Sequence, residues 1–263
     1  MNMGLLKSAP IAHRGLHGKK DDSIIPENTL IAIEEAIRKG YAIEGDIRVT
    51  KDGRLLWVHD GTLKRLTNQT VNTKVENLSE KERLKTGLLG TEHIIPTFAD
   101  VLKLVDGRVP LLIELKKFKF KNETEMREIF GLISEELRIY KDKGPVYLQS
   151  FCPDIFHYKT YAEAGSDIKT GLLIPPFSVA TIPVYTKLVR ENPYDFLAIG
   201  KEGLSNKLIV NFKQKTDGKG VVLAWTIRTK NQASMVLEKV DNIIFEGFEP
   251  NIKNNKSNLT RNR

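Results

Sequence analysis

The chain has 263 residues, of which 40% are hydrophobic and 28% charged, a balance typical of a globular protein and not of a disordered or membrane-spanning one. The formal net charge of +8 favours an anionic ligand, but the basic residues form no stripe with aromatics, so no nucleic-acid partner is expected. The single cysteine, Cys152, excludes an intrachain disulfide, and neither a signal peptide nor a span of about 18 apolar residues is recognisable. We therefore expect a cytoplasmic protein without stable membrane insertion.

Short apolar runs rich in β-forming residues alternate with longer amphipathic segments along the chain. Strands are predicted over residues 10–15, 41–50, 109–116, 145–151, 168–174, 195–200, 221–227 and 242–248. Helices are predicted over residues 29–40, 123–140, 154–165, 179–192 and 230–240. Strict alternation predicts a parallel sheet, and eight such units in a chain of this length favour a closed (β/α)8 TIM barrel over a doubly wound open sheet.

The interval from residue 51 to 108 is too long for one crossover helix. It holds a second short strand at residues 55–60, then polar material, and then an amphipathic segment at 97–105. We interpret it as a small insertion within the second βα unit. One barrel domain is expected over residues 1–250, followed by a basic, flexible tail over 251–263.

Two carboxylates break the apolar pattern of the second strand. Glu44 and Asp46 are two positions apart and so point to one face, and Glu114 occupies the next strand. Three buried acids need a partner, and oxygen ligands alone favour one Mg²⁺ or Ca²⁺ ion at the C-terminal mouth of the barrel. In the alternative arrangement, Glu114 pairs with Lys116 while the other two acids face solvent or Arg48.

Two histidines end short strands. His13 and His59 could supply a general acid and a general base, and Arg14 offers a planar fork for phosphate oxygens. Trp225 ends the seventh strand, where it is interpreted either as a core residue or as a wall of a substrate pocket. Nothing acidic or apolar frames the remaining histidines as a site, so they are interpreted as structural: His17, His93 and His157.

Together these residues resemble the glycerophosphodiester phosphodiesterase family, whose members share a TIM-barrel fold. The match runs from residue 11 to about residue 250, and no single motif carries it. The matching pieces, in family order, are His13-Arg14-Gly15, Pro26-Glu27-Asn28-Thr29, Glu44-Gly45-Asp46, His59-Asp60, Glu114-Leu115-Lys116, Gln149-Ser150-Phe151 and Trp225-Thr226.

The resemblance implies hydrolysis of a small-molecule glycerophosphodiester to sn-glycerol 3-phosphate and an alcohol, with one divalent cation. It also implies the roles of the site residues: Glu44, Asp46 and Glu114 as metal ligands, His13 and His59 as the acid/base pair, Arg14 and Lys116 as phosphate contacts, and Glu27 and Asn28 lining the mouth. The family is thought to use the glycerol 2-hydroxyl as first nucleophile, giving a cyclic phosphate. The residues do not settle which histidine is the base, although His13 as base and His59 as acid is preferred.

The chain departs from the family pattern in two places. The loop over residues 16–25 is longer than usual, and the last strand lacks the usual Thr-Asp-x-Pro ending, having Phe245, Glu246 and Gly247 there. Two other functions stay open: a phospholipase D-like activity on lysophospholipid or sphingomyelin, and a non-catalytic barrel that binds an anion or a membrane surface. Headgroup preference and oligomeric state are not predicted by any pattern in the sequence.

Overall fold

The structure is a computed structural model that describes residues 3–20, 22–67, 73–117, 119–140, 142–161, 168–176 and 181–251. The predicted tail lies outside these ranges except for its first residue, and so do parts of the helices predicted over 154–165 and 179–192. Among the described residues, no helix is both long and apolar enough to cross a bilayer.

Eight parallel strands form the centre of the molecule. They are β1 (Ile11–His13), β4 (Ala42–Val49), β6 (Leu111–Leu115), β7 (Val146–Ser150), β8 (Lys169–Ile174), β9 (Phe196–Gly200), β10 (Val221–Ile227) and β11 (Asn242–Phe245). Each pairs with the next, and β1 pairs with both β11 and β4, so the sheet closes on itself. The predicted (β/α)8 barrel is therefore confirmed.

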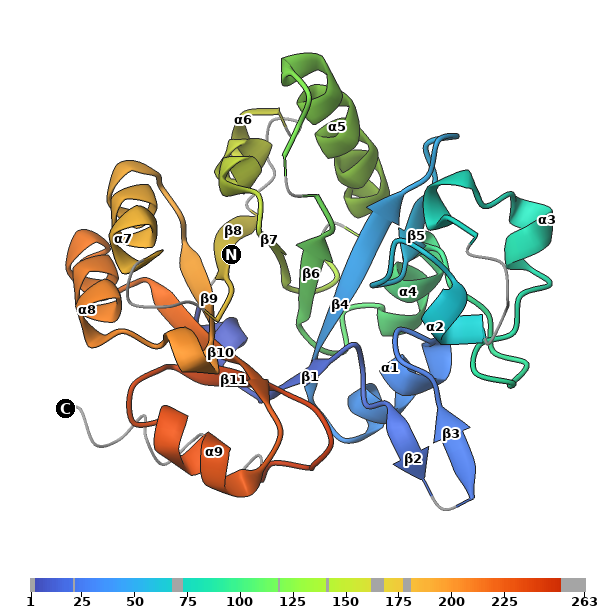
Figure 1. Ribbon diagram of the computed structural model, residues 1–263, viewed down its shortest axis with the longest axis horizontal. Coiled ribbons are helices and arrows are strands. Elements are labelled where there is room, and N and C mark those ends of the chain that lie inside the picture. The colour runs from blue at the N-terminus through green and yellow to red at the C-terminus, as the bar shows by residue number, and fades with distance from the viewer. Residues whose placement is uncertain are drawn as a thin grey trace.

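Helices surround the strands on the outside of the barrel (Figure 1). They are α1 (Leu30–Arg38), α4 (Phe98–Val105), α5 (Glu123–Ile139), α6 (Tyr158–Tyr161), α7 (Ile182–Glu191), α8 (Asn206–Lys215) and α9 (Lys230–Val236), with the 3-10 helices η3 (Pro153–His157) and η5 (Lys201–Gly203). Helix α8 was not predicted. It buries only a narrow apolar face, Leu208, Ile209 and Phe212, in an otherwise mostly polar segment.

The interval after β4 folds as the predicted insertion. Strand β5 (Leu55–Trp57) pairs antiparallel with β4, and α2 (Lys64–Thr67), η2 (Val75–Asn77) and α3 (Glu80–Arg83) follow before α4. The insertion lies to one side of the barrel in Figure 1 and has its own apolar cluster, Leu56, Val58, Leu63, Leu66, Val75, Leu78, Leu88 and Ile95. The long loop near residue 20 forms a small hairpin of β2 (Gly18–Lys20) and β3 (Ser23–Ile25).

The barrel interior changes character from one end to the other. Near the N-terminal ends of the strands it is apolar, and the 3-10 helix η1 (Met3–Lys7) adds Leu6 to that cluster. Asn242 holds this segment in place by donating to the carbonyl oxygens of Leu6 and Ala9 at 2.9 and 2.7 Å. Toward the C-terminal ends the buried positions become polar, and Asp46 lies in register with Glu114, which in turn lies in register with Gln149.

Candidate active site

Three acidic side chains meet inside the C-terminal mouth of the barrel. Glu44 and Asp46 on β4 and Glu114 on β6 are only 2%, 1% and 6% exposed, and one oxygen of each lies within 4.8 Å of the others. Gly45, between the two acids of β4, points the other way against the ring of Trp57, where an added Cβ would lie 2.1 Å from a ring carbon. The absence of a side chain at Gly45 thus lets the insertion pack directly behind the acids.

Several hydrogen-bond donors surround these acids. Lys116 Nζ lies 2.7 Å from Glu114 Oε1 and 3.7 Å from Asp46 Oδ1, so the Glu114–Lys116 pair of the alternative arrangement forms. Asn28 Nδ2 donates to Asp46 Oδ2 at 2.8 Å, and the backbone N–H of Arg14 donates to Glu44 Oε2 at 3.2 Å. Glu44 and Asp46 are buried rather than solvent-facing, and among the described residues neither forms an ion pair with Arg48, so the rest of the alternative arrangement is not seen.

The three carboxyl groups differ in the direction in which their pKa is shifted. Burial, with the neighbouring carboxylates, raises the pKa of Glu44 well above its ordinary value and the pKa of Glu114 to about 8. Burial also acts on Asp46, but the positive charges of His59, Lys116 and Arg14 hold its pKa below the ordinary value.

The acid cluster fits a hard divalent cation. Asp46 Oδ1 is buried and has no hydrogen-bond partner among the described residues, and the ligand set is all oxygen, as Mg²⁺ or Ca²⁺ prefers. A cation there would favour ionised carboxylates where burial alone favours protonated ones.

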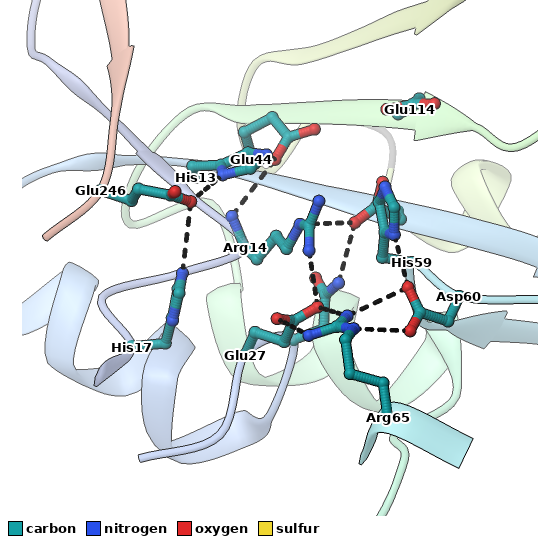
Figure 2. A network of polar contacts seen from close by, with 12 residues as sticks. His13, Arg14, His17, Glu27, Glu44, His59, Asp60, Arg65, Glu114 and Glu246 are labelled. Carbon is teal, nitrogen blue, oxygen red and sulfur yellow. Dashed lines mark hydrogen bonds and ion pairs between the residues drawn. The ribbon is translucent and has the colours of Figure 1, made fainter. Parts of the chain in front are cut away.

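His13, at the end of β1, is held between two carboxylates. Its Nδ1 lies 2.5 Å from Glu246 Oε2, and its Nε2 lies 4.0 Å from Glu44 Oε2 (Figure 2). Because an ionised carboxylate only accepts, Nδ1 carries the hydrogen and Nε2 presents its lone pair to the acid cluster. Arg228 Nε donates to Glu246 Oε1 at 2.7 Å and fixes this carboxylate from its other side. Burial lowers the pKa of His13, although Glu246 opposes the shift.

His59 is supported in a similar way by residues of the insertion. Its Nδ1 lies 2.8 Å from Asp60 Oδ1, and Arg65 Nε of α2 donates to Asp60 Oδ2 at 2.7 Å. Arg48 Nε donates to the backbone carbonyl of His59 at 2.8 Å. Burial is the main cause that lowers the pKa of His59. The lowered pKa values favour the neutral form of both imidazoles, and each imidazole is oriented by a carboxylate that an arginine holds.

Glu27 joins two arginines behind the mouth. It accepts from Arg14 Nη1 at 2.7 Å and from Arg65 Nη1 and Nη2 at 2.7 and 2.6 Å. The backbone of Arg14 has a positive φ of 58°, which ends β1 earlier than predicted and turns this guanidinium toward Glu27 and Asp46. Glu27 therefore orients Arg14, and it does not line the cavity itself.

A cavity at the mouth gathers most of the predicted site. It is lined by His13, Arg14, Glu44, His59, Glu114, Lys116 and Trp225, while Glu27, Asn28 and Asp46 contact these residues from behind. Trp225 Nε1 donates to the carbonyl of Ala198 at 3.0 Å, and its ring meets Phe151 edge-on at 5.7 Å, so it forms a fixed wall.

Three residues of the site were not predicted from the sequence: Glu246, Arg228 and Arg65. Glu246 and Arg228 follow directly after the last two barrel strands, the same kind of position that drew attention to His13. Arg65 lies on a four-residue helix of the insertion, where no periodic pattern marks it.

The chain matches the model of the glycerophosphoryl diester phosphodiesterase family over residues 13–246, and it belongs to this family. The glycerophosphodiester phosphodiesterase of Caldanaerobacter subterraneus subsp. tengcongensis is 37% identical over 117 residues, which cover 42% of this chain and 46% of that protein. A Bacillus subtilis glycerophosphodiester phosphodiesterase is 30% identical over 155 residues, covering 54% of this chain and 51% of the relative. The chain thus spans about half the length of these curated relatives.

Solved structures share the fold. The glycerophosphodiester phosphodiesterase of Thermotoga maritima has a TM-score of 0.66 at 23% identity, over 90% of this chain and 94% of that one. A phosphodiesterase of Oleispira antarctica, solved with the product sn-glycerol-3-phosphate, has a TM-score of 0.71 at 21% identity, over 95% and 96% of the two chains. At these identities the likeness establishes the barrel alone.

Proposed function

We propose that this protein hydrolyses glycerophosphodiesters to sn-glycerol 3-phosphate and an alcohol, using one Mg²⁺ or Ca²⁺ ion. The observation that supports this most is the convergence on one cavity of Glu44, Asp46 and Glu114 with two oriented imidazoles. A non-catalytic barrel has no use for two such imidazoles. The family and the product-bound Oleispira antarctica relative support the choice of substrate.

The acidic residues would hold the cation, and the basic ones the phosphate. Glu44, Asp46 and Glu114 would be the protein ligands, and the bound ion would supply charge neutralisation at the phosphoryl oxygens. Arg14 and Lys116 line the same cavity and would contact the remaining phosphate oxygens.

His13 would act as the base in the first step. Its Nε2 lone pair accepts the proton of the glycerol 2-hydroxyl, whose oxygen forms a bond to phosphorus as the bond to the leaving alcohol breaks. His59, once protonated at Nε2, gives its proton to the departing oxygen, and Asp60 stabilises the imidazolium. Water then opens the cyclic phosphate with the two roles exchanged, which yields sn-glycerol 3-phosphate.

The test is a substrate panel with product analysis. Glycerophosphocholine and glycerophosphoethanolamine should be cleaved with added Mg²⁺ or Ca²⁺, and both EDTA and Glu44→Gln should remove the activity. Lysophosphatidylcholine and sphingomyelin in the same panel examine the phospholipase D-like alternative. Full activity in both EDTA and Glu44→Gln, or no turnover of any substrate, would contradict the proposal.

A cytoplasmic location remains a prediction that rests on the single cysteine.

A further inference from the structure

A second cluster of metal-ligating groups lies on the far side of His13 from the acid cluster. Nδ1 or Nε2 of His13 and His17 and a carboxylate oxygen of Glu246 all lie within 4.8 Å of one another. Figure 2 shows His17 and His13 both directed at the Glu246 carboxylate, from different parts of the chain. The cluster is separate from Glu44, Asp46 and Glu114, and the proposed reaction gives His17 no task.

The turn after β1 fixes the position of His17. Arg14 and Gly15 both have positive φ, 58° and 76°, and together they reverse the chain so that His17 returns toward the strand end. Leu16 donates to the carbonyl of Ala32 at 2.8 Å, and a Cβ on Gly15 would lie 2.8 Å from the same backbone. The tight packing of this turn against α1 holds His17 in place before any ligand arrives.

His17 is directed at the carboxylate at ion-pair distance, without a close hydrogen bond to it. Its Nε2 is buried and lies 3.8 Å from Glu246 Oε2, and among the described residues it has no hydrogen-bond partner. Leaving a buried nitrogen unsatisfied is unfavourable, because its hydration is lost without replacement. A ligand between His17 and Glu246 would satisfy this atom.

The donor set of this cluster differs from that of the acid cluster. Two imidazole nitrogens and one carboxylate oxygen form the set that zinc prefers, with a fourth position left for water. In a tetrahedral site with bonds of about 2.0 to 2.1 Å, neighbouring donor atoms lie about 3.3 Å apart. The observed spacings of 2.5 Å for His13–Glu246 and 3.8 Å for His17–Glu246 bracket that value.

We propose that His13 Nδ1, His17 Nε2 and Glu246 Oε2 form a second metal site, selective for Zn²⁺, through which zinc inhibits the enzyme. Zinc on Nδ1 would replace the hydrogen that Glu246 accepts, which leaves to solvent as a proton, and it would place a divalent charge on the imidazole that must take up the substrate's proton. Arg228 can stay on Glu246 Oε1, so the carboxylate remains oriented. The inhibition, though not the binding, rests on the proposed function.

Zinc binding is tested without reference to activity. Wild-type protein in excess Mg²⁺, which keeps the acid cluster filled, is titrated with Zn²⁺ against a chromophoric chelator. One zinc ion should bind per chain, and His17→Asn should weaken its affinity by about tenfold or more. His93→Asn, which removes another half-buried histidine from the insertion, is the matched control and should change nothing. Equal zinc affinity in wild type and His17→Asn would overturn the proposal.

Zinc inhibition is then measured on the same proteins. In excess Mg²⁺, the zinc concentration that halves turnover should rise about tenfold or more in His17→Asn, while turnover without zinc stays close to wild type. If His17→Asn does not fold, as judged by its melting curve, His17→Gln replaces it. Unchanged inhibition in a folded variant would mean that zinc acts at the acid cluster, which overturns the proposal. If no substrate is turned over, the proposed function fails, while the binding titration still decides whether the zinc site exists.

Discussion

The two imidazoles of the site have the same kind of support, built from different parts of the molecule. His13 contacts Glu246, which is 233 positions away in sequence, so its support exists only when the first and last strands of the barrel pair. His59 contacts the adjacent Asp60, and the insertion supplies Arg65 to hold it. Closure of the barrel thus positions His13, and the insertion positions His59.

Removal of either imidazole should have the largest effect. We expect His13→Asn and His59→Asn each to lower kcat by about 100- to 10,000-fold, since each removes a proton transfer. A substrate with an acidic leaving group, such as a nitrophenyl ester of glycerol phosphate, separates their roles because departure then needs no proton. His59→Asn should recover most of its loss on that ester, and His13→Asn should not.

The reverse pattern on the nitrophenyl ester would exchange the two assignments and make His59 the base. Equal recovery by both variants would contradict separate acid and base roles for His13 and His59. Lysine or arginine replacements are unsuitable controls here, because they would add a charge beside the acid cluster. His93→Asn, which is distant in sequence from both His13 and His59, is the better control.

Replacement of the carboxylates that orient the two imidazoles should have the next largest effect on kcat. Glu246→Gln and Asp60→Asn keep the shape of the side chain but lose its charge, and we expect each to lower kcat by about 100-fold through misplacement of the imidazole. Glu246 opposes the burial that lowers the pKa of His13, and Asp60 does so for His59. The pKa of the affected histidine should therefore fall further in each variant.

The pH profiles of kcat/KM distinguish the two variants. A base works unprotonated, so a lower pKa of His13 in Glu246→Gln should shift the acidic limb to lower pH. An acid works protonated, so a lower pKa of His59 in Asp60→Asn should shift the alkaline limb to lower pH. If both variants move the same limb, the two supports do not serve different steps.

The buried carboxyl groups of the acid cluster should make the free energy of unfolding depend on pH when no cation is bound. The pKa of Glu114 is raised to about 8 in the folded chain, chiefly by burial and then by Asp46, against about 4.3 for an unperturbed glutamate. Between these values the folded chain binds more protons than the unfolded one, so in EDTA the free energy of unfolding falls as pH rises.

Excess Ca²⁺ or Mg²⁺ should reverse that trend, because the ion favours ionised carboxylates. The difference in melting temperature between cation and EDTA should therefore grow from about pH 5 to about pH 8. Glu114→Gln should flatten the dependence in EDTA. Melting curves that are indifferent to the cation across this range would count against a metal site at Glu44, Asp46 and Glu114.

The sequence predicted the acid cluster better than it predicted the supports, for a physical reason. Glu44 and Asp46 are constrained by the two-residue period of a single strand, and Glu114 by the pairing of consecutive barrel strands, so regular strand geometry places all three. The contact of Glu246 with His13 depends on closure between the chain's two ends, and the unusual ending of the last strand concealed it. Arg65 lies on a helix too short to have a period.

The smallest effects should come from the arginines that hold the two carboxylates. Arg65 and Arg228 are 50% and 57% exposed, so replacing either by lysine should change the free energy of unfolding by about 1 kcal/mol or less. Their geometry differs, however. Arg65 donates to both Glu27 and Asp60, whereas the guanidinium of Arg228 bonds only Glu246 among the described residues.

A lysine at position 65 has no planar fork and cannot bridge both carboxylates in the same way. Arg65→Lys should therefore disturb Arg14, through Glu27, as well as His59, and we expect KM to rise together with a fall in kcat. Arg228→Lys should mainly lower kcat, with a smaller rise in KM than in Arg65→Lys, because Arg228 lines the cavity but bonds Glu246, which touches the proton carrier. Steady-state kinetics on glycerophosphocholine measures both constants. If the two variants change kcat and KM in the same way, Arg65 only orients His59, as Arg228 orients His13. It then does not couple His59 to the phosphate contact Arg14.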